Sequence, residues 1–188
     1  TLDGTLFPYT TLFRSSPWAI QELQESPVHY FQRPGAGYLD YDITRRSLSG
    51  HGGKIEAGKG SGGHWKYSAA LSWLSPGLDI NDIGYMRSAD EIENQNNLSY
   101  FITKPVSVFR TLSVGFEQRN SWNFNGTYLG SDGEVEFRTN FTNNWQLQAE
   151  LAYHSADIDT RLLRGGYDIN MPGSFDVELG LRSNESKK

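Results

Sequence analysis

Apolar and polar residues alternate along residues 134–154, with one three-residue break at 142–144. The apolar positions are Val135, Phe137, Phe141, Trp145, Leu147, Ala149, Leu151 and Tyr153. Successive side chains of a β-strand point to opposite faces, so this pattern predicts two strands, each with one apolar and one polar face. The break reads Thr-Asn-Asn. Because asparagine tolerates positive φ and bonds its own backbone, the break predicts a hairpin turn.

The same alternation predicts further strands at 48–59, 64–74, 98–103, 106–116 and 175–181. In the second of these, Trp65 and Trp73 stand at the two ends of the apolar face. A transmembrane β-strand needs about 9–11 residues and carries aromatic rings at both membrane interfaces. The glycines at 50, 52 and 53 predict a bulge or bend in the first strand. Arg110 interrupts the apolar positions of 106–116, which predicts a bulge or a side chain that reaches back to an interface.

The predicted connections alternate in length. Residues 60–63, 103–105 and 142–144 are short turns, whereas residues 75–95, 117–133 and 155–173 are long excursions. Within 117–133, Trp122, Phe124 and Tyr128 offer the alternative that the flanking strands extend into the excursion. A transmembrane barrel has short turns at its periplasmic rim and long loops at its outer rim, and a soluble sandwich has no reason to sort its loops in this way. We therefore expect an all-β antiparallel meander of about seven strands that forms an incomplete outer-membrane-type β-barrel.

The barrel fragment is expected to take residues 47–188, with the strand near Leu48 at one edge of the sheet. Residues 16–46 have little periodicity and three prolines, so we expect an irregular lead-in with a short helix at 19–25. Residues 5–15 resemble the in-frame translation of a common short-read sequencing adapter. We therefore predict that residues 1–15 are an adapter-derived artefact and leave them out of the expected fold.

Composition narrows the function classes. The net charge is -5 and no basic patch stands out, which disfavours a nucleic-acid partner. With 0 cysteines, neither a disulfide framework nor a cysteine-ligated metal site is expected. Nucleophile-elbow, P-loop and dinucleotide fingerprints are missing from the sequence, so we do not expect an enzyme. No catalytic, cofactor-binding or metal-binding residue is assigned, and no cofactor is expected.

Three groups of polar residues are candidates for binding a metal ion or an anion, and each also fits an ordinary structural role. The four histidines, at 29, 51, 64 and 154, share no metal-binding spacing and fit strand or loop positions. The acidic residues at 79, 82, 90, 91 and 93 lack the Asp-x-Asp-x-Asp-Gly order of a calcium loop, so we favour Asx turns and a solvated loop. Arg161 and Arg164 fit either lipopolysaccharide phosphates or acidic residues of other loops, and we favour an ion pair across loops.

Six segments carry a resemblance to one family. They are residues 30–34 (YFQRP), 38–42 (YLDYD), 47–50 (SLSG), 62–65 (GGHW), 75–85 (SPGLDINDIGY) and 160–166 (TRLLRGG). Together they resemble the C-terminal region of the domain-of-unknown-function 5916 family, over about residues 30–188. The resemblance implies an outer-membrane-type barrel here and, upstream, a module similar to family-nine carbohydrate-binding domains. It brings no catalytic residues with it.

The expected function is therefore a fragment of a bacterial outer-membrane β-barrel that binds or takes up a carbohydrate or another nutrient. Its partners would be outer-membrane lipid and, through the upstream module, carbohydrate. The alternative is a soluble, secreted β-sandwich that binds glycans through Trp65, Trp73, Trp122 and Trp145. A barrel places its aromatic residues on the outside at two heights, whereas a lectin gathers them on one concave patch.

Overall fold

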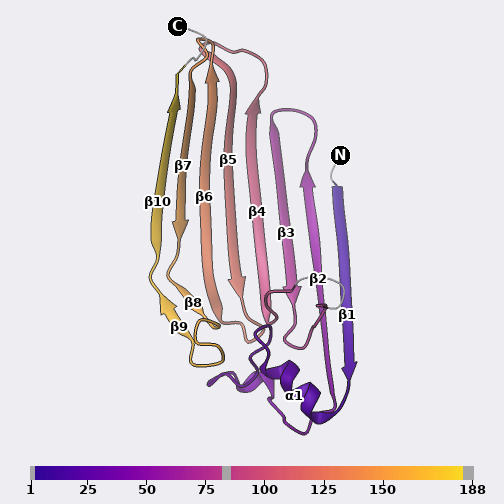
Figure 1. The fold of residues 1–188 in the computed structure, drawn as a ribbon. Coiled ribbons are helices and arrows are strands. Elements are labelled where there is room, and N and C mark those ends of the chain that lie inside the picture. Colours follow the sequence, from indigo (N-terminus) through magenta and orange to yellow (C-terminus); the bar gives the residue numbers. More distant parts are fainter. Residues whose placement is uncertain (1–2, 82–85, 184–188) are drawn as a thin grey trace.

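One antiparallel sheet dominates the computed structural model, which describes residues 3–81 and 86–183 (Figure 1). Its eight strands follow the order β1-β2-β3-β4-β5-β6-β7-β10. They are β1 (Asp3–Arg14), β2 (Ser47–Lys59), β3 (Trp65–Leu74), β4 (Glu91–Ile102), β5 (Phe109–Trp122), β6 (Tyr128–Phe141), β7 (Gln146–His154) and β10 (Ser174–Arg182). The all-β meander is thus confirmed, and each of the seven predicted strands is present.

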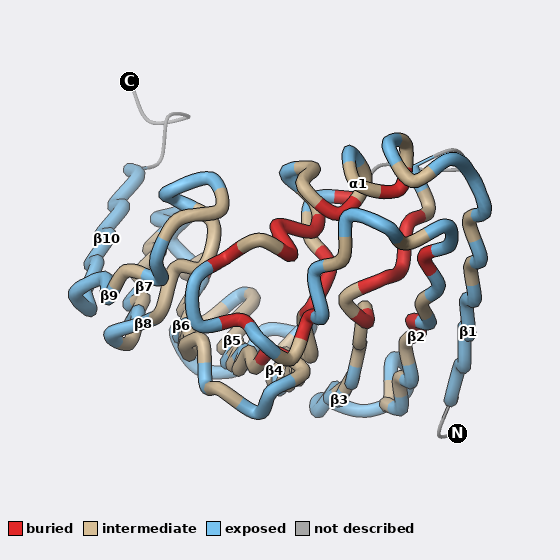
Figure 2. Tube along the Cα trace, turned by 90° about the horizontal axis from the view of Figure 1, so that it is seen from below, coloured by how far each residue is buried: buried red, intermediate tan, exposed pale blue. Residues whose placement is uncertain are grey.

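The sheet is curved into a trough that does not close. In Figure 2 the strands follow a U-shaped path from β1 to β10, and α1 (Pro17–Glu25) lies at its open side. Among the described residues, the free sides of β1 and β10 are not paired with another strand. This open, curved sheet agrees with the expected partial barrel.

The adapter-like segment forms the edge strand β1, which pairs with β2 from Asp3↔Gly58 to Arg14↔Ser47. The expectation that the strand near Leu48 would be an edge is therefore wrong. An unpaired strand offers a row of free N–H and C=O groups, and a segment rich in Thr, Leu, Phe and Tyr readily pairs with such an edge. The prediction that residues 1–15 are an adapter-derived artefact is a statement about the gene sequence. The fold does not test it, and it stays a prediction.

Consecutive connections of the antiparallel meander lie at opposite rims, and the long connections all lie at the lower one (Figure 1). Residues 15–46, 75–81, 86–90 and 155–173 share the lower rim. The first range holds α1 and η1 (Gly37–Leu39), and the last holds the small hairpin of β8 (Asp157–Asp159) and β9 (Ile169–Met171). No helix among the described residues is long and apolar enough to cross a membrane.

The predicted long excursion at 117–133 is wrong, because β5 and β6 continue through it and only residues 123–127 connect them. The prediction failed because the apolar alternation stops at Gln118 and Asn120. Strand pairing is carried by the backbone, and both strands stay in register as far as Ser121↔Gly130. β4 likewise begins at Glu91, earlier than the predicted start at 98.

Two local predictions on turns and bulges are confirmed. Asn144 has a φ of 67°, and the Phe141 N–H donates to the Trp145 carbonyl at 2.8 Å, which closes the hairpin between β6 and β7. The β5–β6 register shifts between Phe109 and Thr111, so Arg110 sits at a bulge. Its guanidinium donates to the Thr142 carbonyl at 3.3 Å.

The glycines of β2 do not form the predicted bulge. Pairing with β1 is continuous through positions 50, 52 and 53, and pairing with β3 begins at Gly52 and continues without a register shift. A Cβ at Gly50 would lie 2.0 Å from the backbone nitrogen of Leu78, and a Cβ at Gly77 would lie 2.2 Å from the Ser49 carbonyl oxygen. These glycines therefore let the β3–β4 connection lie directly on β2.

Candidate functional site

The lower rim carries a compact structure that we call the cap, formed by residues 16–46, 75–81 and 86–90. Its two hydrophobic clusters are centred on Ile20, Phe31, Ala36, Leu39 and Leu48, and on Leu78, Met86 and Ala89. Figure 2 shows these buried residues in red at the open side of the trough and along the strand ends beneath it. Ser16 is the N-cap of α1, and its hydroxyl accepts from the Ala19 N–H at 3.3 Å. This helix confirms the short helix predicted at 19–25.

Contacts between the cap and the strand ends identify the concave face of the sheet. Leu48 and Leu74 pack into its two clusters. By strand register, Leu74 shares a face with Lys66, which aligns across the sheet with Glu136 and Glu150. We call this the concave face and the opposite one, which carries Leu71 and Leu151, the convex face.

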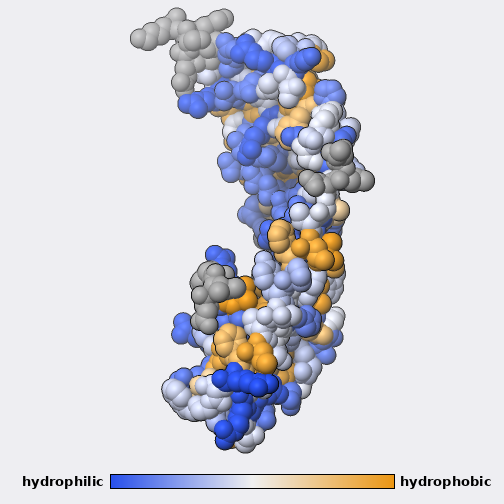
Figure 3. Space-filling view, turned by 90° about the vertical axis from the view of Figure 1, so that its right-hand side faces the viewer, coloured by the Kyte–Doolittle hydropathy of each residue, from blue (hydrophilic) through white to orange (hydrophobic). Residues whose placement is uncertain are grey.

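Charged side chains line the concave face. They are Lys54, Glu56, Lys66, Glu91, Glu93, Glu117, Arg119, Asp132, Glu134, Glu136, Arg138, Glu150, Asp176, Glu178 and Arg182. Figure 3, an edge-on view, shows hydrophilic residues along the hollowed side of the molecule. Acidic residues outnumber basic ones here, so this surface attracts cations and repels anions.

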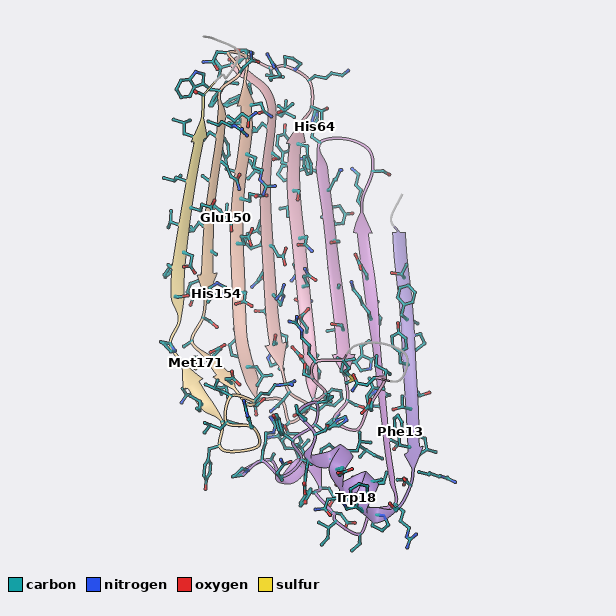
Figure 4. The ribbon with its side chains drawn as sticks, viewed as in Figure 1. Phe13, Trp18, His64, Glu150, His154 and Met171 are labelled. Carbon is teal, nitrogen blue, oxygen red and sulfur yellow. The ribbon has the colours of Figure 1, made fainter. Side chains whose placement is uncertain are left out.

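Like charges lie directly opposite one another on this face. Glu136 pairs with Glu150, and Glu150 pairs with Glu178, so three carboxylates cross three neighbouring strands. Directly opposed like charges destabilise a sheet, which is tolerable where water solvates them. Figure 4 shows Glu150 near the middle of β7 and His154 at its lower end. His154 offsets part of the charge, with ring nitrogens 2.7 Å from Asp132 and 3.7 Å from Asp176.

A buried ion pair holds the cap together. The Arg33 guanidinium donates to Asp90 at 2.8 Å, and both side chains are only 5% exposed. The Tyr38 hydroxyl donates to the same carboxylate at 2.5 Å, and the Phe124 N–H donates to its other oxygen at 3.0 Å. Burial, together with the bond to Asp90, raises the pKa of Tyr38 above its ordinary value. Asp90 thus ties the lead-in to the start of β4 and to the β5–β6 connection.

His29 forms the second polar centre of the cap. Its Nδ1 lies 2.8 Å from the Pro76 carbonyl oxygen, and its Nε2 lies 3.4 Å from the Asp79 carboxylate. Burial is the largest influence on this imidazole and lowers its pKa below the ordinary 6.5. Burial favours the uncharged ring, which has one N–H and therefore donates to one of these two acceptors, joining the lead-in to the β3–β4 connection.

Arg161 brings the β7–β10 connection to the cap, but through backbone carbonyls and not through the expected ion pair. Its guanidinium donates to the carbonyls of Pro27, at 2.6 Å, and of Arg87. Carbonyls at the ends of irregular segments lack strand partners, and a forked guanidinium can serve two of them at once. A cavity of roughly 790 Å³ opens beside this junction, lined in part by Arg87, Asp132 and Asp159.

The acidic residues singled out from the β3–β4 region are dispersed by the fold. Asp79 faces His29 and Asp90 faces Arg33. Glu93 lies on the concave face, 3.7 Å from Arg119, while Asp82 lies outside the described residues. Among the residues that the structure describes, no group of three or more His, Asp or Glu side chains could hold a metal ion.

The tryptophans of β3 and β5 stand on the convex face at two levels. At the upper level Trp65 lies against Tyr100, with ring centroids 4.8 Å apart. At the lower level Trp122 lies against Tyr128 at 5.9 Å, and Trp73 stands in the same row across the sheet. The structure thus separates the tryptophans and does not gather them on one concave patch.

The roles of Tyr38 in the cap and of Phe124 in the β5–β6 connection beside it were not predicted from the sequence. The resemblance points to Tyr38, because its segments 30–34, 38–42, 75–81 and 160–166 all meet at the cap, but it does not include Phe124. Even the Gly165 backbone lies close to Gln32, since a Cβ there would come within 2.5 Å of the amide nitrogen.

One comparison with known proteins identifies the family of this chain. A family model described as "Domain of unknown function (DUF5916)" matches residues 32–188. The chain belongs to this family. The match takes in most of the cap and every strand from β2 to β10, and begins after β1 and α1. Neither the curated proteins nor the solved structures contain a match to the chain.

Proposed function

We propose that this DUF5916 chain is part of the wall of a bacterial outer-membrane β-barrel. In this proposal the convex face contacts lipid, the concave face lines a water-filled lumen, and the cap narrows the mouth at the outer rim. The long connections would face the cell exterior, as they do in known barrels. Its role would be to bind or pass a carbohydrate or another nutrient, without catalysis.

One observation carries the proposal: large apolar side chains stand exposed in the middle of the sheet. Leu98, Phe116, Val135 and Leu151 align across four strands and are each 42–45% exposed. Water makes such a contiguous apolar surface costly, whereas lipid does not. The charged concave face completes the pattern of a barrel strand, which alternates apolar outward and polar inward.

The open edges fit a wall that further strands complete. Hydrocarbon does not tolerate the unpaired N–H and C=O groups of a strand edge, so a sheet in lipid must close on itself. We propose that a longer polypeptide supplies the missing strands, together with the carbohydrate-binding module that the resemblance implies. That module, and not a residue of this chain, would recognise sugar.

The glycan-binding sandwich is the second candidate. A sandwich needs two sheets packed about 10 Å apart, with the apolar faces inside. Within the described residues, the sheet besides the eight-stranded one is the β8–β9 hairpin of three-residue strands. It lies at the lower rim, away from the convex face (Figure 1). The separated tryptophans also favour the barrel.

Tryptophan fluorescence tests the proposal. Variants of the full-length protein that keep one tryptophan of this region each would be folded into vesicles with brominated phospholipids, which quench rings in contact with acyl chains. We expect quenching of Trp65 and Trp73, at two different depths, and little quenching of Trp18, which is exposed on the cap. Equal quenching of all three, or of none, would contradict a lipid-facing convex surface.

A further inference from the structure

A stripe of amide side chains interrupts the apolar convex face. Asn94 lies opposite Asn120, and Asn96 lies opposite Gln118, so four amides form a block on β4 and β5. The same two rows also hold four small residues, Ala57, Ala69, Ser131 and Gly133. Two larger apolar residues complete the row of Asn94, since Leu71 lies opposite Asn94 and Ile55 lies beyond Leu71. We call the four amides and the four small residues the amide stripe.

The amide stripe lies between two apolar rows. Leu98, Phe116 and Val135 form the row on one side, and Ile92, Trp122 and Tyr128 form the row on the other. From Ile92 to Tyr100 an extended strand covers about 27 Å, which a tilted strand brings close to the roughly 25 Å apolar band of a barrel. If the convex face contacts lipid, as proposed above, the amides fall within the hydrocarbon.

The described part of the chain satisfies these amides incompletely. The Asn94 side chain donates to the Ala70 carbonyl at 3.2 Å, and the Asn96 side chain donates to the Asn94 amide oxygen at 2.7 Å. Within the described residues, no hydrogen bond engages the side chains of Gln118 and Asn120. Hydrocarbon offers no hydrogen-bond partners, so the unpaired amides favour contact with protein. Small neighbours allow that partner to come close to the backbone.

We propose that the amide stripe is an interface with a second copy of this chain in the membrane; this inference rests on the proposed function. Every copy inserts in the same orientation, so a twofold axis along the membrane normal keeps each residue at its own depth. The stripe of one copy therefore meets the stripe of the other. A side-chain amide both donates and accepts hydrogen bonds, so the two stripes are self-complementary without any charge.

Cysteine cross-linking tests this contact, because the chain has 0 native cysteines. Asn96→Cys and Gln118→Cys would be introduced singly into an otherwise cysteine-free full-length protein, folded in membranes and oxidised. We expect disulfide-linked dimers with both variants. The matched control is Leu151→Cys, also on the convex face but two strands beyond Gln118, which should stay monomeric and react with a lipid-soluble maleimide.

The other outcomes separate the two proposals. If both stripe variants stay monomeric and react with the lipid-soluble reagent as Leu151→Cys does, the stripe faces lipid and the interface is disproved, while the barrel stands. If Leu151→Cys reacts only with water-soluble reagents, the barrel itself fails. Cross-links to a different protein would also overturn the assignment to a second copy. Combined Asn96→Leu and Gln118→Leu substitutions should abolish the dimer in native mass spectrometry while the folded monomer remains.

Discussion

The cap and the sheet bury apolar side chains in opposite ways. Each fully or nearly fully buried hydrophobic residue among the described residues belongs to the cap or, like Leu48, to a strand end beneath it. Leu78 in the cap is 0% exposed, whereas Leu179 on β10 is 74% exposed. The same chain therefore contains a small, water-excluding core and a broad apolar surface that nothing in the described structure covers.

This difference shows what stabilises each region. The cap follows the rules of a soluble domain, with a hydrophobic core and a buried, hydrogen-bonded ion pair. The sheet holds its shape through backbone pairing and leaves its convex side chains to the surroundings. Substitutions in the cap should therefore change stability by removing contacts within the protein. Substitutions on the convex face should change stability according to whether water or lipid surrounds the side chain.

The largest effect is expected from Asp90→Ala, which leaves the Arg33 guanidinium buried without its partner. Breaking one side of a buried ion pair costs about 3–5 kcal/mol. The loss should appear as faster hydrogen exchange of the α1 amides while the strands keep their protection. As a control, Lys54→Ala removes an exposed ion pair with Glu56 and should cost about 0–1 kcal/mol. Similar losses in both variants would contradict a cap held by Asp90.

The next effect concerns the sheet. Leu71→Arg puts a charge on the convex face, which costs about 2–4 kcal/mol near the middle of a bilayer. Ala70→Arg, one residue earlier, puts the same charge on the concave face opposite Glu56 and should be much milder. Unfolding of both variants from vesicles by denaturant measures the difference. Equal losses of unfolding free energy in the two variants would contradict a convex face in lipid and a concave face in water.

The stability of the cap should depend on pH through His29. Because burial lowers the pKa of His29, the unfolded cap binds a proton that the folded cap resists. Stability of the cap should therefore be constant above about pH 6.5 and fall as the pH drops below that value. Asp79 and Arg161 are the charged groups that act on this ring. Hydrogen exchange of α1 measured against pH checks this, and His29→Gln should remove that dependence.

The smallest effect is expected from Ser16→Ala, which removes the hydroxyl that accepts from the Ala19 N–H. Loss of a helix N-capping side chain costs about 1 kcal/mol. The first turn of α1 should fray, seen as faster exchange of its amides, while β10 is unaffected. Ser16→Asp keeps an acceptor at this position and should restore protection; failure of this rescue would assign the effect to something other than helix capping.

The strands could be predicted because their signal is local. Alternation revealed both faces of β7 and the hairpin before it, and the interruption at Arg110 pointed to a bulge. The extension of β5 and β6 was only the alternative to a long excursion, because Gln118 and Asn120 break the alternation on the convex face. The cap was missed because its contacts are distant in sequence: Arg33 and Asp90 are 57 residues apart. Nothing in the sequence near either residue identifies the other.

Reagent accessibility along β7 tests the lipid-facing convex surface most directly. Single cysteines would replace residues 146–151 of the full-length protein in its membrane, and each would be treated with a lipid-soluble and a water-soluble maleimide. We predict an alternation of period two, in which positions 147, 149 and 151 react with the lipid-soluble reagent and positions 146, 148 and 150 with the water-soluble one. Reaction of all six positions with the water-soluble reagent alone would show that the convex face of this sheet does not contact lipid.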